Sequence, residues 1–121
     1  MAKKLLIVED EKILGDMYEE TFSQAGYEVS LTSSVEEGLK TAKSIKPDLI
    51  LLDILLSQDN GLVFLKKLRE DSELSLTPVI AFSNYDDPET KKEAIKLGVK
   101  DYLLKTDFTP QAIVEKVKGY L

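Results

Sequence analysis

Acidic residues directly follow two apolar segments of the sequence. Glu9 and Asp10 come after Leu5–Val8, and Asp53 comes after Leu49–Leu52. An aspartate that ends a buried strand is costly unless it caps a helix or binds a partner. Carboxylates that converge raise one another's pKa unless a cation lies between them, and Mg²⁺ prefers such oxygen ligands. These residues could therefore hold a divalent cation, beside which Asp53 could attack a phosphoryl donor.

Two further polar residues, Ser83 and Lys105, follow the apolar segments Val79–Phe82 and Tyr102–Leu104. A hydroxyl can donate a hydrogen bond to a phosphoryl group, and a lysine supplies a compact positive charge. Taken singly, each polar residue has an ordinary interpretation as a helix start, a cap, a turn residue or a surface lysine. Their shared position after apolar segments favours a single site.

The composition limits the chemistry and the partners. The chain has 121 residues, no Cys, no His and a net charge of −6. A zinc finger and a nucleophile based on Cys or His are therefore excluded, and any metal must bind oxygen. The acidic balance argues against direct binding of nucleic acid or of an anionic membrane. Because no apolar segment approaches about 18 residues, we expect no membrane span and a cytoplasmic protein. The length and composition fit one domain over residues 1–121.

The elements that must position these residues alternate along the chain. Segments that start at residues 5, 27, 49, 79 and 102 read as strands, and helix-period segments separate them. This rhythm predicts an α/β fold: a doubly wound, five-stranded parallel sheet with helices on both faces. The segment from Tyr27 to Leu31 alternates between apolar and polar residues, as is typical of an edge strand. In the flavodoxin-like order 2-1-3-4-5, the first and third strands are neighbours, so Asp10 and Asp53 would face each other.

Local signals predict where the helices begin and end. Ser34, Asp87 and Thr109 are candidate N-caps, and proline follows the last two directly. Gly26 and Gly98 can close the helices that precede them. A further helix is expected from about Gly61.

The motifs at the strand ends resemble those of the receiver domain of two-component response regulators, over essentially the whole chain. Five motifs carry the resemblance: Val8-Glu9-Asp10-Glu11, Leu51-Leu52-Asp53-Ile54, Asn60-Gly61, Phe82-Ser83 and the segment from Gly98 to Lys105. The resemblance implies that Asp53 accepts a phosphoryl group from a phosphohistidine of a sensor histidine kinase or phosphotransfer protein. It implies no other enzymatic activity than this autophosphorylation and the later dephosphorylation.

The resemblance also implies roles for the neighbouring residues. Mg²⁺, or Mn²⁺ in its place, would be held by Asp10, Asp53 and the backbone carbonyl of Leu55, with Glu9 beside them. Lys105 and Ser83 would contact the phosphoryl group. A switch would follow, in which Ser83 moves toward that group and Tyr102 rotates inward. The altered surface, formed by the fourth helix, the fifth strand and the fifth helix, would be recognised by a downstream protein or a second copy of the domain.

Three departures from the family pattern lead to specific expectations. Leu56 and Ser57 stand where methionine and proline are common, and we expect a looser loop that keeps its chemistry. Asn84 and Tyr85 stand where the first residue is usually small. With Leu55, they are expected to crowd an attacking water and to lengthen the life of the phosphoryl group.

Thr106 follows Lys105, where the family usually has a proline in a cis peptide bond. A cis bond at a non-proline residue costs about 2.5–4 kcal/mol. The sequence therefore leaves two possibilities, a strained loop or a different approach of Lys105 to the site.

Other functions are weighed against this one. A flavin carrier needs a Ser/Thr/Gly-rich loop where this chain has three acids, and a haloacid-dehalogenase-type phosphatase needs a second acid where Leu55 stands. The main alternative is a receiver-like interaction module that is never phosphorylated, which Ser57, Asn84 and Thr106 favour and the acids and Lys105 oppose. Because the chain ends at Leu121, where the fifth helix is expected to finish, it fits either a stand-alone regulator or a fragment cut from a longer one, and we expect the stand-alone regulator.

Overall fold

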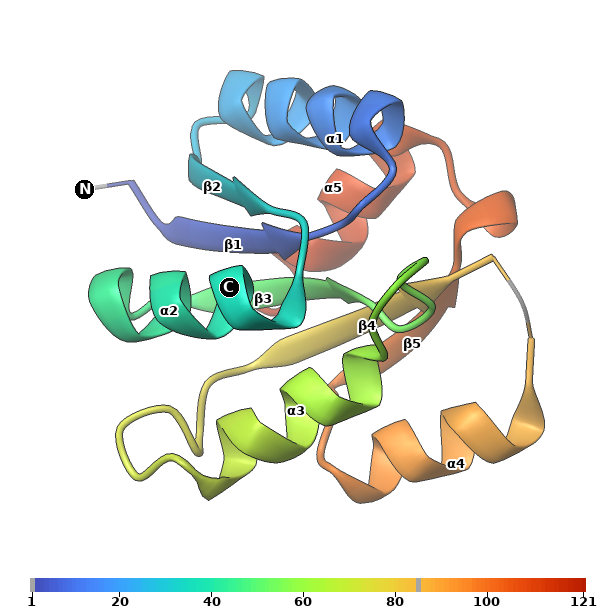
Figure 1. The fold of residues 1–121 in the computed structure, drawn as a ribbon. Coiled ribbons are helices and arrows are strands. Elements are labelled where there is room, and N and C mark those ends of the chain that lie inside the picture. Colours follow the sequence, from blue (N-terminus) through green and yellow to red (C-terminus); the bar gives the residue numbers. More distant parts are fainter. Residues whose placement is uncertain (1, 85) are drawn as a thin grey trace.

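The computed structural model describes residues 2–84 and 86–121, which form a parallel sheet between two layers of helices (Figure 1). The strands lie in the order β2-β1-β3-β4-β5, as predicted. β2 is an edge strand, as its alternating sequence indicated, and β5 forms the other edge. The strand bounds are β1 Lys4–Val8, β2 Glu28–Thr32, β3 Leu49–Asp53, β4 Val79–Ser83 and β5 Asp101–Leu104.

The helices cover both faces of the sheet (Figure 1). α1 (Lys12–Gln24) and α5 (Pro110–Lys118) cover one face. α2 (Val35–Ile45), α3 (Gly61–Glu70) and α4 (Pro88–Lys96) cover the other. A short 3₁₀ turn, η1 (Lys105–Asp107), joins β5 to the segment before α5.

The helix ends follow the local sequence signals. Side-chain oxygens of Ser34, Asn60, Asp87 and Thr109 accept hydrogen bonds from backbone N–H groups in the first turns of α2, α3, α4 and α5. These bonds satisfy donors that a helix start otherwise leaves unpaired. Gly26 and Gly98, which follow α1 and α4, have φ angles of 101° and 84°, a conformation that glycine adopts without strain.

The core is divided into two layers by the alternation of side chains along each strand. Leu5 and Ile7 pack toward α1 and α5, whereas Leu6 and Val8 pack toward α2, α3 and α4. Every residue of β3 is buried, because both of its faces are covered. This explains why the central strands read as continuous apolar segments and why the polar residues that follow them stand out.

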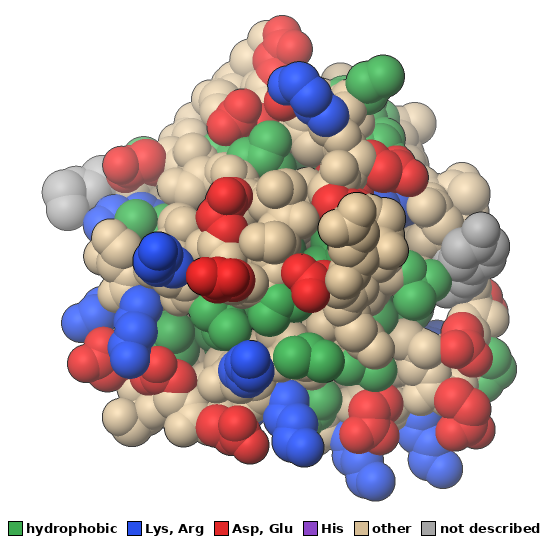
Figure 2. Space-filling model, viewed as in Figure 1, with side chains coloured by type: hydrophobic (Ala, Val, Ile, Leu, Met, Phe, Trp, Pro, Cys, Tyr) green, Lys and Arg blue, Asp and Glu red, His purple; other side chains and the backbone are tan. Residues whose placement is uncertain are grey.

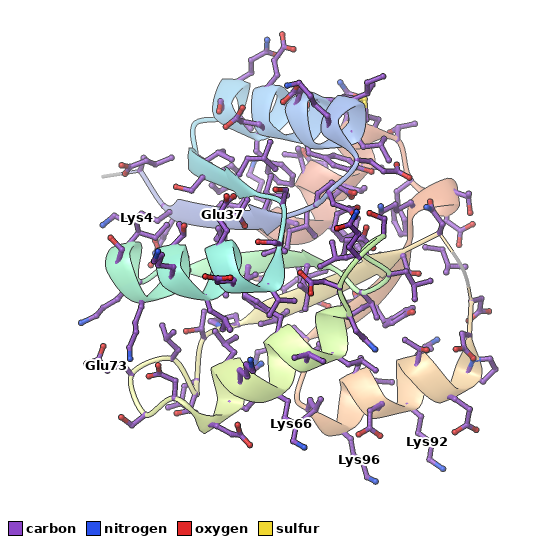
Figure 3. All side chains as sticks on the ribbon, in the orientation of Figure 1. Lys4, Glu37, Lys66, Glu73, Lys92 and Lys96 are labelled. Carbon is purple, nitrogen blue, oxygen red and sulfur yellow. The ribbon has the colours of Figure 1, made fainter. Side chains whose placement is uncertain are left out.

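The surface is highly charged. Lysine and acidic side chains alternate along the lower edge of the face shown in Figure 2. Lys66 on α3 and Lys92 and Lys96 on α4 are exposed and extend away from the sheet (Figure 3). Among the described residues, no helix is both long enough and apolar enough to span a membrane.

Candidate functional site

The carboxyl ends of β1 and β3 bring three carboxylates together. Val8 pairs with Leu52, so the residues that follow the two strands are neighbours at the same edge of the sheet. Glu9, Asp10 and Asp53 each place a carboxylate oxygen within 4.8 Å of the others. Glu9 and Asp53 are almost completely buried, and Asp10 is partly exposed. The expected convergence of Asp10 and Asp53 is thus present in the structure.

Lys105 supplies the positive charge between two of these carboxylates. Its ammonium donates a hydrogen bond of 2.7 Å to Glu9 Oε2 and another of 3.1 Å to Asp53 Oδ2. The ammonium also lies 4.8 Å from the centre of the Phe82 ring, within the range of a cation–π interaction. The Tyr18 ring packs edge-on against Phe82, with ring centres 5.5 Å apart. Lys105 is therefore held from two sides.

The residue after Lys105 does not prevent this placement. No peptide bond in the described part of the chain is cis, so the bond between Lys105 and Thr106 is trans. Lys105 is the first residue of η1, and it still reaches Glu9 and Asp53. Of the two possibilities that the sequence left open, the strained cis bond is absent.

The site carries more negative than positive charge. The pKa of Asp53 is raised to about 7, mainly by burial and also by the nearby Glu9 carboxylate, although Lys105 and the Leu55 N–H oppose the shift. Burial tends to lower the pKa of Lys105, but its hydrogen bonds to Glu9 and Asp53 outweigh this and raise it above the ordinary value. A divalent cation among these oxygen atoms would offset the excess negative charge. The donor set therefore fits a hard cation such as Mg²⁺.

The loop after β3, residues 54–60, is attached directly to the carboxylates. The Leu55 N–H donates to Asp53 Oδ1 at 3.1 Å. The Ser57 N–H and hydroxyl both donate to Asp10 Oδ2. The expectation that serine loosens this loop stays a prediction, but Ser57 supplies two donors to Asp10 that a proline would lack.

Gly61 brings the end of this loop close to the backbone of β3. A Cβ atom at Gly61 would lie 2.6 Å from the Asp53 carbonyl oxygen and 2.6 Å from Ile54 Cα. The Gly61 N–H donates to the Ile54 carbonyl at 2.8 Å. The Asn60-Gly61 motif thus lets α3 begin directly against the segment that carries Asp53.

The two candidate switch residues lie on neighbouring strands. Ser83 is completely buried at the end of β4, and Tyr102 on β5 pairs with Ala81. Burial raises the pKa of the half-buried Tyr102, and the nearby Ser83 hydroxyl partly offsets this. No hydrogen bond of standard geometry joins the buried Tyr102 hydroxyl to another described residue. The Ser83 hydroxyl nevertheless lies near the Tyr102 hydroxyl.

The expectation about the phosphoryl lifetime stays a prediction. Asn84 is exposed and Leu55 is 43% exposed, both near the carboxyl end of the sheet. Tyr85, the third residue in that expectation, lies outside the described residues.

Two contacts of the site were missed from the sequence. Phe82 was counted as a strand residue, and no sequence signal showed that Lys105 would lie against its ring. Ser57 was noted only as a departure from proline. Its two hydrogen-bond donors were the signal that could have indicated an attachment to Asp10.

Comparison with known proteins gives the family. The family model of the response regulator receiver domain matches residues 5–118. The chain belongs to this family. It is therefore a receiver domain of two-component systems, and receiver domains bind Mg²⁺ at an acidic pocket and interact with kinases and downstream targets.

Relatives of known name agree with this assignment. The receiver domain is 34% identical over 121 residues to the polar-differentiation response regulator DivK of Brucella ovis, covering all of this chain and 98% of DivK. It is also 34% identical to the alkaline phosphatase synthesis transcriptional regulatory protein PhoP of Bacillus subtilis, again over the whole chain, but it spans only 49% of PhoP.

Solved structures show the same fold. The chemotaxis response regulator CheY4 of Vibrio cholerae, crystallized at low pH, superposes with a TM-score of 0.92 at 28% identity over 100% of both chains. A CheY-like receiver domain protein from Methanospirillum hungatei gives a TM-score of 0.90 at 26% identity, over 98% of this chain and 93% of that one.

Proposed function

We propose that residues 1–121 form a phosphoacceptor domain that takes a phosphoryl group from a phosphohistidine onto Asp53. The donor would be a sensor histidine kinase or a phosphotransfer protein. A carboxylate oxygen of Asp53 attacks phosphorus, an O–P bond forms, and the N–P bond of the phosphohistidine breaks with its electron pair going to the imidazole. The observation that carries the proposal is the position of Asp53, which is buried beside the acids that follow β1 and accepts a hydrogen bond from the Lys105 ammonium.

The neighbouring residues would hold the reacting groups in place. Asp10, Asp53 and the Leu55 carbonyl would hold Mg²⁺ or Mn²⁺, with Glu9 beside them. The bound cation would offset the negative charge that develops during transfer. Lys105, now paired with Glu9 and Asp53, would contact the transferred phosphoryl group.

The output would begin with the residues beside Asp53. Ser83 would donate a hydrogen bond to the phosphoryl group, and Tyr102 would follow into the space that Ser83 leaves. This change would alter the surface of α4, β5 and α5, which would then bind a downstream protein or a second copy of the domain. We propose a cytoplasmic location, no direct contact with nucleic acid or membrane, and no catalysis beyond its own phosphorylation and dephosphorylation.

The alternative of a module that is never phosphorylated has lost two of its three supports. Thr106 was a reason to doubt the position of Lys105, yet the ammonium lies 3.1 Å from Asp53 Oδ2. Ser57 was another, yet it is hydrogen-bonded to Asp10. The remaining departure, Asn84, does not touch the acids in any described contact.

A mass measurement tests the proposal. The protein is incubated with Mg²⁺ and acetyl phosphate, and its intact mass is recorded with and without EDTA. We expect the gain of one phosphoryl group in the parent and in an Asp107→Asn control, which removes an exposed carboxylate outside the site. Asp53→Asn should gain none. A parent that gains no mass with Mg²⁺ present would instead favour the inert interaction module.

A further inference from the structure

The buried carboxylates of the site are already engaged by hydrogen-bond donors. Glu9 accepts a bond from the Glu11 N–H on Oε1 and from Lys105 on Oε2. Asp53 accepts a bond from the Leu55 N–H on Oδ1 and from Lys105 on Oδ2. Each oxygen of these two side chains therefore has a protein donor before any cation arrives.

Asp10 differs from the other two acids. Both of its donors, the N–H and the hydroxyl of Ser57, bind the same oxygen, Oδ2. Among the described residues, none donates a hydrogen bond to Asp10 Oδ1. Asp10 is also the most exposed of the three acids, and it lines a surface cavity of about 280 Å³ together with Ser57. Asp10 Oδ1 is thus the carboxylate oxygen of the cluster that is most available to an entering cation.

We infer that Ser57 is a positioning residue for the divalent cation of this receiver domain. Its two donors fix Asp10 Oδ2 and thereby leave Oδ1 free for the cation. Ser57 also lies two residues after Leu55, whose carbonyl is the proposed backbone ligand. The same two hydrogen bonds therefore tie the ligand that follows β1 to the loop that carries the ligand after β3. This inference rests on the proposed function, because it assigns a role toward the same cation.

The physical reason is pre-organisation. A carboxylate that rotates freely must be ordered when a metal binds, and the loop that carries a carbonyl ligand must be ordered with it. Hydrogen bonds to ligating carboxylates remove part of this cost in advance, and losing such a bond typically weakens metal binding about 10–100-fold. A proline at this position would supply neither donor. In this chain, Ser57 holds the Asp10 carboxylate in place through these two hydrogen bonds.

Direct measurement of Mg²⁺ binding tests the inference. The metal-stripped parent and its variants are titrated with MgCl₂ by isothermal calorimetry, and no phosphodonor is present. Ser57→Ala removes the hydroxyl and keeps the N–H, so we expect the Kd for Mg²⁺ to rise about tenfold. Ser57→Thr restores a hydroxyl and should bind nearly as tightly as the parent.

Ser33→Ala is the matched control. Ser33 is an exposed serine that lines the same cavity but makes no described side-chain contact with Asp10, so its removal should leave the Kd unchanged. Thermal unfolding without metal is measured for all variants. A role confined to folding would lower the unfolding temperature of Ser57→Ala and leave its Kd as in the parent.

Equal Kd values for the parent and Ser57→Ala would overturn the inference and leave the proposed function standing, since the parent still binds Mg²⁺. Tighter binding by Ser57→Ala would also overturn it, because Ser57 would then compete with the cation for Asp10. A parent that binds no Mg²⁺ would remove both the inference and the proposed cation site.

Discussion

Asp53 is a carboxylate in a place that disfavours its charge. Its side chain is buried, Glu9 is nearby, and both share a single ammonium, that of Lys105. Such an arrangement is poor for stability, because an ion that loses its water must recover the lost solvation from its partners. It suits a group that must bind a cation and then accept a phosphoryl group, because the two carboxylates share one ammonium and an added cation can balance the remaining negative charge.

The raised pKa of Asp53 predicts a specific pH dependence of stability. In the folded protein without metal, the raised pKa lets Asp53 keep its proton up to about pH 7, whereas the ordinary pKa of an unfolded aspartate is 3.8. Between these two values the folded state binds more protons than the unfolded state, so the contribution of Asp53 to the free energy of unfolding falls as the pH rises. We expect this loss from about pH 4 to about pH 7, measured by urea unfolding in EDTA.

Asp53→Asn isolates this contribution. The amide carries no charge at any of these pH values, so the stability of the variant relative to the parent should increase steadily from pH 4 to pH 7 and then level off. Adding Mg²⁺ at pH 8 should stabilise the parent more than the variant. A difference between the two proteins that stays constant from pH 4 to pH 8 would contradict the raised pKa.

The residue types of the site could be predicted, but several contacts could not. Asp10, Asp53 and Lys105 were found because each follows an apolar segment and parallel strands end at one edge of the sheet. The bond between Ser57 and Asp10 depends on the path of a loop, which apolar periodicity does not determine. The support of Lys105 by the Phe82 ring depends on tertiary packing in the same way.

At the scale of elements, the pattern of apolar residues predicted a strand's place in the sheet best where the strand was buried on one face only or on both faces. The alternating residues of β2 indicated an edge, and the continuous apolar residues of β3 indicated a strand covered on both faces. Helix starts were predictable because their caps are local. The close contact of α3 with β3 was not predicted, although Asn60-Gly61 marks the place where it occurs.

Gly61→Ala is expected to disturb the junction of β3 and α3. The added Cβ would lie 2.6 Å from the Asp53 carbonyl oxygen and from Ile54 Cα, and backbone atoms cannot change rotamer to avoid it. We expect a loss of about 1–3 kcal/mol in the free energy of unfolding, as is typical of overpacking, measured by urea unfolding. Phosphorylation of Asp53 should also slow, because the shifted backbone carries the acceptor.

Gly119→Ala is the control for this variant. A Cβ there would lie 3.4 Å from the Lys116 carbonyl oxygen, an ordinary contact, and φ at Gly119 is −65°. Its stability should match or slightly exceed that of the parent, because alanine lowers the entropy of the unfolded chain. If Gly61→Ala were as stable as Gly119→Ala, the close approach at Gly61 would not constrain the site.

At the scale of the whole molecule, one side chain joins three segments on the α3–α4 side. Arg69, the only arginine of the chain, lies near the end of α3. Its guanidinium donates to the carbonyl oxygens of Leu97 and Gly98 in the turn before β5, at 2.8 and 3.2 Å. It also donates to the carbonyls of Ser75 and Thr77 in the segment before β4, at 3.1 and 2.7 Å.

This connection matters because α4 is otherwise weakly anchored. Ala94 is the only residue of α4 that is fully buried, and Ile95 on the same helix is 56% exposed. A helix with so little buried apolar surface can shift with a small free-energy cost. Arg69 therefore fixes the carboxyl end of α4 through the turn that follows it.

Arg69→Lys tests whether the guanidinium fixes the carboxyl end of α4. A lysine has one ammonium and cannot reach four carbonyl oxygens in two segments, so at least some carbonyls lose a charged donor. We expect a loss of about 2 kcal/mol in the free energy of unfolding and faster amide exchange in residues 96–99, measured by hydrogen–deuterium exchange. Lys66→Ala, which removes an exposed side chain of α3, should change neither quantity. Unchanged exchange at residues 96–99 in Arg69→Lys would show that α4 is held by its apolar contacts and not by the guanidinium.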